Sequence, residues 1–475
     1  MTRRTALREE AGTGPIFTES VMAVAGRSAG RFEPWWSERT RSNHFQVTPI
    51  GFEELEYWHF DPETGNLGHL SGKFFTIEGL HVRSDYGPVR EWSQPIINQP
   101  EIGILGILVK YFDGVPHCLM QAKMEPGNVN TLQLSPTVQA TRSNYTRVHR
   151  GDGTRYLEHF AGPGRGRVLV DVLQSEQGSW FYRKHNRNMV VEAIGDVPLY
   201  DDFCWLSLRQ VLDLLHVDNL VNMDARTVLS CMSFFPPRGD SGSRHAPPDF
   251  RRALARSLDR SCGALHDLGE ILSWFTEEKT RHEVSTRLIP ANKITGWNRS
   301  AGEIAHDEGK HFSLIAVNVE ATNREVPSWR QPLLAPIERG VIAVLAKPIE
   351  GVTHLLMHAR VEPGFIDAVE LGPTLQCIPG NYADLPGSQR PRYLEYVLGS
   401  DPARIRFDAF LSEEGGRFFD AQNRYLVIEV EDDFPVRSPD GYRWVTLHQL
   451  NELLRHGHYL NVEARSLVAC LHSLW

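Results

Sequence analysis

The chain has 475 residues, of which 41% are hydrophobic and 23% charged, so it can form two globular domains and is not an intrinsically disordered protein. Its formal net charge of −9 excludes a protein that binds nucleic acid or an anionic membrane through overall positive charge. Any anionic ligand must be held by a local group of basic residues.

The N-terminal residues 1–17 lack the apolar stretch of a secretion signal, and no later segment approaches the ~20 apolar residues of a spanning helix. The six cysteines are scattered, without a CxxC pair or the spacing of zinc ligands. These features predict a cytoplasmic protein with reduced cysteines.

The first informative element in chain order is a strand predicted over 115–127. Polar residues alternate there with apolar ones, so they share one face of the strand: His117, Gln121, Lys123 and Glu125. A second alternating strand over 133–141 carries Gln133, Thr137 and Gln139, and its internal Pro136 predicts an edge or a bulge. The two polar faces predict either the floor of a polar pocket or a solvated sheet surface.

Two later segments carry groups suited to an anionic ligand. A turn-rich stretch over 143–153 offers phosphate contacts through Asn144, Tyr145, Arg147, His149 and Arg150, although it could equally be a charged surface loop. The segment 173–188 supplies Glu176, Trp180, Lys184 and Arg187. Trp180 could stack on a base or serve as a core residue beside a glycine turn.

The end of this first half and the start of the next are marked by helices and a linker. A helix is predicted over 206–215, a Pro-, Gly- and Ser-rich linker over 234–250, and an amphipathic helix over about 250–279. The body between the helices is rich in predicted strands.

An internal repeat sets the architecture. Residues of the first half recur 237 positions later in one register, as in Phe75 and Phe312, His117 and His354, or Glu125 and Glu362. The repeat predicts an α+β domain present twice, with a first copy over 1–233, a linker over 234–250 and a second copy over 251–475.

Several long segments resemble the NDP-hexose 2,3-dehydratase family: EIGILGILVKYFDGVPHCLMQAKMEPGN, QLSPTVQATRSNYTRVHRG and LQSEQGSWFYRKHNRNM, with SWRQP and HARVEPGF in the second copy. The resemblance implies two Nudix-like α/β/α sandwich domains in a homodimer. It further implies a dTDP-4-keto-6-deoxyglucose type substrate, no redox cofactor, a downstream 3-ketoreductase and a role in deoxysugar biosynthesis for antibiotics. A nucleotide-sugar hydrolase or a non-catalytic nucleotide-sugar binding protein of the same fold are the alternatives.

The dehydration chemistry calls for a base at C-3, stabilisation of the C-4 enolate and an acid for the leaving C-2 hydroxyl. The titratable candidates are His117, Lys123, Glu125, Tyr145 and Glu176, with Glu125 or His117 favoured for proton transfer. The candidates for substrate binding are Trp92, Gln121, Gln133, Thr137, Gln139, Asn144, Arg147, His149, Arg150, Trp180, Lys184 and Arg187. Because the second copy replaces Arg147 by Asp384 and His149 by Pro386, only the first copy is expected to support turnover.

The sequence contains neither the Nudix box that holds divalent metal nor the GxGxxG fingerprint of dinucleotide binding. We therefore expect turnover to survive exhaustive chelation and to need no added nicotinamide or flavin. The measurement is the initial rate of dehydration before and after EDTA treatment. Loss of activity on chelation, with recovery on adding Mg²⁺ or Mn²⁺, would contradict this expectation.

Overall fold

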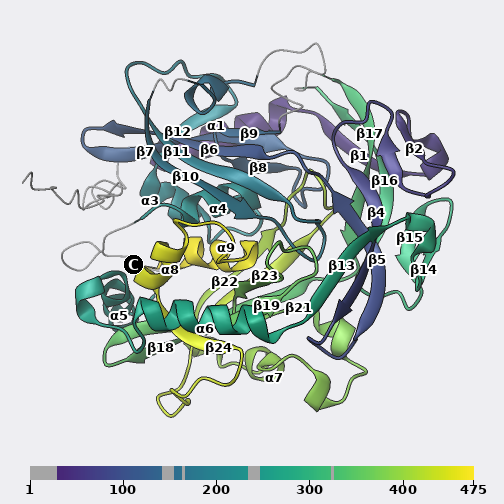
Figure 1. Ribbon diagram of the computed structural model, residues 1–475. Coiled ribbons are helices and arrows are strands. Elements are labelled where there is room, and N and C mark those ends of the chain that lie inside the picture. Colours follow the sequence, from purple (N-terminus) through teal and green to yellow (C-terminus); the bar gives the residue numbers. More distant parts are fainter. Residues whose placement is uncertain (1–28, 142–153, 163–165, 234–245, 323–325, 475) are drawn as a thin grey trace, which may run out of the picture.

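The computed structural model describes residues 29–141, 154–162, 166–233, 246–322 and 326–474 (Figure 1). The first copy contains α1 (Ala29–Ser42), β1 (Phe45–Ile50), β2 (Trp58–Phe60), β3 (Leu67–His69), β4 (Thr76–Ser84), β5 (Glu91–Asn98), β6 (Gly103–Phe112), β7 (Val115–Met124), β8 (Leu132–Ser135), β9 (Val138–Ala140), β10 (Gly166–Ser175), β11 (His185–Ala193), β12 (Phe203–Ser207), α3 (Leu208–Leu214) and α4 (Met223–Ser230).

The second copy repeats this order after an additional helix, α5. Its elements are α5 (Pro248–Leu258), α6 (Leu268–Arg281), β13 (Val284–Ile289), β14 (Trp297–Arg299), β15 (Glu303–His306), β16 (Phe312–Ala321), β17 (Ser328–Pro336), β18 (Gly340–Ile349), β19 (Val352–Val361), β20 (Val369–Gly372), β21 (Leu375–Cys377), α7 (Leu394–Leu398), β22 (Ile405–Ser412), β23 (Gln422–Glu429), β24 (Tyr442–Thr446), α8 (Leu447–Leu453) and α9 (Val462–Leu471).

Each copy builds one large mixed sheet of the same topology. In the first copy the strand order is β10-β11-β6-β7-β12, with β8 beside β7 and β9 beside β6; in the second it is β22-β23-β18-β19-β24, with β20 beside β19 and β21 beside β18. Among the described strands, one parallel pair occurs in each of these sheets, and it joins equivalent strands, β6 with β11 and β18 with β23. The predicted α+β class and duplication are confirmed.

The two smaller sheets exchange strands between the copies. Strand β1 of the first copy pairs with β16 of the second, so that Phe45 lies opposite Ala321. Reciprocally, β13 of the second copy pairs with β4 of the first, so that Val284 lies opposite Ser84. The linker separates the copies in sequence, whereas the sheets interlock them in space.

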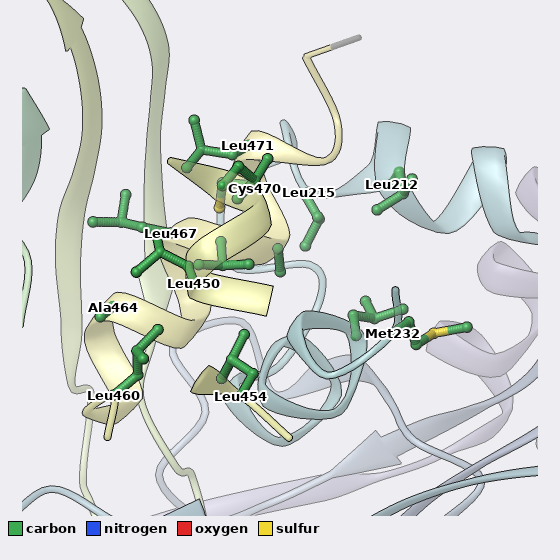
Figure 2. Packing of buried hydrophobic residues seen from close by; sticks show 14 of the residues in the cluster. Leu212, Leu215, Met232, Leu450, Leu454, Leu460, Ala464, Leu467, Cys470 and Leu471 are labelled. Carbon is green, nitrogen blue, oxygen red and sulfur yellow. The ribbon is translucent and has the colours of Figure 1, made fainter. Parts of the chain in front are cut away.

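The centre of the molecule is one hydrophobic core shared by both copies. Helices α4 and α9 lie next to each other between the two large sheets (Figure 1), and every residue of both helices is buried. Such helices have no solvent-facing side, so their amphipathic pattern is weak. Figure 2 shows Leu212, Leu215 and Met232 of the first copy on one side of this core and Leu450, Leu454 and Leu467 of the second copy on the other.

Two of the predicted elements are each divided into two in the structure. The strand over 133–141 is interrupted at Pro136, so β8 pairs with β7 while β9 pairs with β6. The helix predicted over 250–279 is two helices, α5 and α6, because the chain turns at Gly263, where φ is 83°. Residues 234–245 of the predicted linker lie outside the described residues, and Pro248–Phe250 belong to α5. Within the described segments no helix is long and apolar enough to cross a bilayer.

Candidate active site

The site is built where each copy's last hairpin reaches the other copy. Residues 176–184 connect β10 to β11 and form the first hairpin loop; residues 413–421 connect β22 to β23 and form the second hairpin loop. The Gly127 N–H donates to the Gly415 carbonyl at 2.7 Å, and the Gly364 N–H donates to the Gly178 carbonyl at 2.7 Å. Each hairpin loop therefore docks on the turn that follows the polar strand of the other copy.

Two buried arginines hold the bases of these loops. Arg226 of α4 donates from Nη2 to the Ser412 carbonyl at 2.6 Å, and Arg465 of α9 donates to the Ser175 carbonyl at 2.5 Å. Both guanidinium groups are fully buried, and a guanidinium offers five donors in a fixed geometry. The central helices thus fix both hairpin loops relative to the sheets.

The first-copy cluster is the group of charged side chains at the end of β7: Lys123, Glu125, Glu176, Lys184, Asp224, Glu414 and Arg417. Lys123 Nζ lies 3.1 Å from Glu125 Oε1, which also accepts a hydrogen bond from Gln139 Nε2 at 2.9 Å. An ammonium and an amide donor stabilise the charged carboxylate. Asn222 in turn holds the Gln139 amide oxygen at 3.4 Å.

Burial gives this cluster unusual titration properties. It raises the pKa of Glu414 to about 7, with Glu125 and Glu176 adding to the effect. Burial raises the pKa of Asp224 well above its ordinary value, and the nearby Glu414 and Glu176 carboxylates raise it further. Burial also lowers the pKa of Lys184 to about 8, although the negative charges of Glu176 and Glu414 act in the opposite direction and raise it. Perturbed pKa values of this kind are typical of sites that transfer protons.

The second-copy cluster repeats part of this arrangement with Arg360, Glu362, Glu413, Glu463 and Gln177. Arg360 Nε lies 2.7 Å from Glu362 Oε1, which also accepts from Gln376 at 3.0 Å, as in the first copy. The positions equivalent to Glu414 and Lys184 are Gln177 and Ala421. The second-copy cluster therefore lacks the equivalents of the Glu414 carboxyl and the Lys184 ammonium of the first-copy cluster.

Tyr86 of the first copy also reaches this second-copy cluster. Its hydroxyl lies 3.2 Å from His358 Nε2, and the His358 ring stacks on Tyr442 with ring centroids 4.3 Å apart. His358 is the residue next to Arg360 on the same strand face. A phenol and two stacked rings thus occupy the space beside Arg360.

Glu370 is a buried acid that has no assigned role in the reaction, and it makes the stability of the second copy depend on pH. Ser175 Oγ donates to Glu370 at 2.6 Å, and burial raises the pKa of Glu370 to about 8. Its equivalent, Gln133, accepts the same bond from Ser412 at 2.9 Å. Because the folded pKa is raised, the stability that Glu370 gives at low pH is lost as the pH rises from its ordinary pKa towards 8.

We expect Glu370→Gln to flatten this dependence, since the amide of Gln133 shows that the site accepts a neutral acceptor. The wild type should lose up to about 1.4 kcal/mol per pH unit more than the variant between pH 5 and 8. Urea unfolding at several pH values measures the difference. Parallel stability curves for the two proteins would contradict the expectation.

The structure brings together only some of the residues singled out in the sequence. Lys123, Glu125, Gln139, Glu176 and Lys184 lie in or beside the first-copy cluster. Gln121 lies further back along β7, opposite Ser135 and Phe203. Asn144, Tyr145, Arg147, His149 and Arg150 lie outside the described residues.

His117 lies at the opposite end of β7 from Glu125. The two are eight residues apart on an extended strand, about 26 Å at ~3.3 Å per residue. His117 Nδ1 lies 2.9 Å from the Val115 carbonyl, and its equivalent His354 makes the same contact and accepts from the Leu265 N–H at 2.9 Å. The histidine that recurs at positions 117 and 354 therefore makes backbone contacts in both copies, which is a structural reason for its recurrence.

The other candidates from the sequence are buried or contact other groups of the protein. Thr137 Oγ1 donates to the Leu119 carbonyl and accepts from the Leu108 N–H, and Gln133 is fully buried. Trp180 packs edge-on against Phe418 with ring centroids 4.4 Å apart, and Trp92 donates to Gln94 at 2.9 Å. Arg187 forms a half-exposed ion pair with Asp171 on β10.

Three members of the cluster did not stand out in the sequence. Asp224 could have been found from the repeat, because Glu463 is an acid at the equivalent position. Glu414 and Arg417 could not, because their equivalents are Gln177 and Trp180 and only the docking of the copies places them. In the described part of the chain, no three His, Cys, Asp or Glu residues are grouped as a metal site.

Comparison with known proteins supports the internal repeat and points to a family. The family model described as NDP-hexose 2,3-dehydratase matches twice, over residues 29–232 and 268–471. The chain is 55% identical to a dTDP-4-dehydro-6-deoxy-alpha-D-glucopyranose 2,3-dehydratase of Saccharopolyspora spinosa, covering 94% of this chain and 91% of the relative. Proteins of the same description from Amycolatopsis orientalis and Streptomyces violaceoruber are each 51% identical, over 92% and 93% of this chain and 89% and 97% of theirs.

Proposed function

We infer that this chain, which belongs to the NDP-hexose 2,3-dehydratase family, removes water from C-2 and C-3 of a dTDP-linked 4-keto-6-deoxyglucose. The product is a 3,4-diketo-2,6-dideoxy sugar. The observation that carries this proposal is the Glu125 carboxylate, held at 3.1 Å by Lys123 within a cluster of buried charges. A carboxylate fixed beside cations suits proton abstraction next to a ketone.

The first step assigned to the cluster is removal of the C-3 hydrogen by Glu125. The C-4 ketone makes this hydrogen acidic, because the electron pair left behind spreads onto the ketone oxygen. Lys123 and Lys184 supply positive charge for that oxygen, and a buried ammonium is worth more there than one in water. Loss of the C-2 hydroxyl and tautomerisation complete an internal redox exchange between C-2 and C-3, which consumes no redox cofactor.

The finer features implied by the family resemblance are part of the same proposal. Each copy is a Nudix-like sandwich, an assignment supported by a mixed sheet with one parallel pair and helices packed against it. The chain acts as a cytoplasmic homodimer, and a 3-ketoreductase consumes its product in a deoxysugar pathway for antibiotics. His117 has a structural role, supported by its distance from Glu125.

The test is incubation of the purified protein with dTDP-4-keto-6-deoxyglucose in D₂O, followed by trapping with a 3-ketoreductase and NADPH. We expect loss of the C-2 hydroxyl and one deuterium at C-2 of the trapped sugar. Release of dTMP would instead indicate a hydrolase. Recovery of unchanged substrate, with binding detected by calorimetry, would indicate a non-catalytic binding protein.

A further inference from the structure

We propose that Glu414, carried by the second copy, is the acid that protonates the departing C-2 hydroxyl in the first-copy site. This inference rests on the proposed function and adds to it a catalytic residue contributed across the two copies. One catalytic site then needs both halves of the chain.

The position of Glu414 is fixed by the first copy. The Gly127 N–H bonds the Gly415 carbonyl, and the Asp420 N–H returns a bond to the Gly127 carbonyl at 2.9 Å. A Cβ at Gly127 would lie 1.6 Å from the Phe418 carbonyl oxygen, so only glycine permits this approach. The second hairpin loop is therefore seated directly on the turn that begins with Glu125.

The two carboxyl groups lie close to each other beside Gly416. A Cβ placed on Gly416 would lie 2.8 Å from Glu414 Oε1 and 3.7 Å from Glu125 Oε1, so these two oxygens are separated by no more than those distances combined. Glu125 is 7% exposed and Glu414 is half-buried, so both carboxyl groups are at least partly removed from bulk water.

Glu125 and Glu414 have different surroundings, which suit one to act as a base and the other as an acid. Glu125 contacts an ammonium and an amide donor, which favour its charged form, whereas burial and two neighbouring carboxylates raise the pKa of Glu414 to about 7. A pair of carboxyl groups whose environments differ in this way is the usual arrangement for one base and one acid. Glu176 Oε2 is buried and has no hydrogen-bond partner among the described residues, so the cluster retains capacity to bind a polar group.

The step balances in atoms and electrons. Glu125 takes the C-3 proton and the C–H electron pair forms the enolate; the enolate then forms the C-2–C-3 double bond while the C-2–O bond breaks. The leaving oxygen takes the Glu414 proton and departs as water. The proton on Glu125 exchanges with solvent; Glu125 then delivers a proton to C-2, and the O-3 enol proton passes to Glu414, which restores both groups.

The test is Glu414→Gln, compared with Gln177→Ala in the first hairpin loop. The chain already has glutamine at the equivalent position 177, so the substitution fits the loop, and thermal unfolding checks that it does. We expect elimination to fall by about 10²-fold or more, the usual effect of losing a positioned acid, while deuterium exchange at C-3 continues in D₂O. Gln177→Ala should leave the elimination rate within several-fold.

A substrate with fluoride in place of the C-2 hydroxyl sharpens the test, because fluoride needs far less help from an acid to leave. Glu414→Gln should eliminate fluoride at a rate within several-fold of the wild type. Elimination of water at the wild-type rate, loss of C-3 exchange together with elimination, or no recovery with fluoride would each overturn the assignment. Failure of the wild type to dehydrate its substrate would instead refute the proposed function.

Discussion

Replacing Glu125 by glutamine should lower kcat for dehydration by about 10²-fold or more, whereas Glu362→Gln should leave kcat within several-fold of the wild type. The two glutamates are equivalent in the repeat and have matching contacts, with a cation at 3.1 or 2.7 Å and an amide donor at 2.9 or 3.0 Å. Both substitutions should therefore cost similar stability. A difference in kcat between the two variants would then reflect the roles of the two clusters in the reaction and not a difference in folding.

The reason to expect the first copy to be active lies in the neighbours of each glutamate. Near Glu125 the chain places Glu414 and Lys184, whereas the equivalent positions near Glu362 are Gln177 and Ala421. The Tyr86 hydroxyl also bonds His358 beside the second cluster. The proposed reaction uses the Glu414 carboxyl and the Lys184 ammonium, and the second-copy cluster has no equivalent of either.

The measurement is steady-state kinetics with the ketoreductase trap, alongside thermal unfolding of each variant. His117→Ala provides a further comparison and should change kcat only several-fold, because His117 lies far from Glu125 on β7. Equal losses for Glu125→Gln and Glu362→Gln would mean that both copies are active or that one site uses both glutamates. A larger loss for Glu362→Gln would move the activity to the second copy.

The sequence predicted the parts of the site that lie on one strand or in one loop. Alternation along 115–127 placed Lys123 and Glu125 on a common face, and the charged and aromatic residues of the segment 173–188 drew attention to Glu176 and Lys184. These predictions need only local geometry, because side chains two residues apart on a strand always share a face. The same alternation could not show that His117 and Glu125 lie at opposite ends of β7, about 26 Å apart at ~3.3 Å per residue.

The rest of the site depends on how the copies dock. Glu414 reaches the first-copy cluster because the Gly127–Gly415 hydrogen bond seats the second hairpin loop there, and no periodic pattern records a contact between residues so distant in sequence. Asp224 lies in α4, where every residue is buried. Burial alone therefore cannot distinguish an acid of the candidate site from the core residues around it. The local sequence pattern likewise does not show that β1 and β13 pair with strands of the other copy.

Lys184→Ala is expected to have the second large effect, a fall in kcat of about 10²-fold. Lys184 is 5% exposed, and its ammonium donates to the Glu101 carbonyl and lies near the Glu176 and Glu414 carboxyl groups. Alanine occupies the equivalent position 421, so the backbone accepts the change. Removing the ammonium takes away positive charge where the enolate oxygen develops.

The pH profile separates this electrostatic role from a loss of folding. Glu414 faces Arg417, Lys184, Glu125 and Glu176, and its pKa of about 7 predicts that the wild type loses activity as the pH rises through that value and the acid ionises. Lys184 lowers the pKa of Glu414, so in Lys184→Ala that pKa must rise and the basic limb of the kcat profile must move to higher pH. A lower rate with an unmoved basic limb, or one moved to lower pH, would show that Lys184 does not act on this carboxyl group.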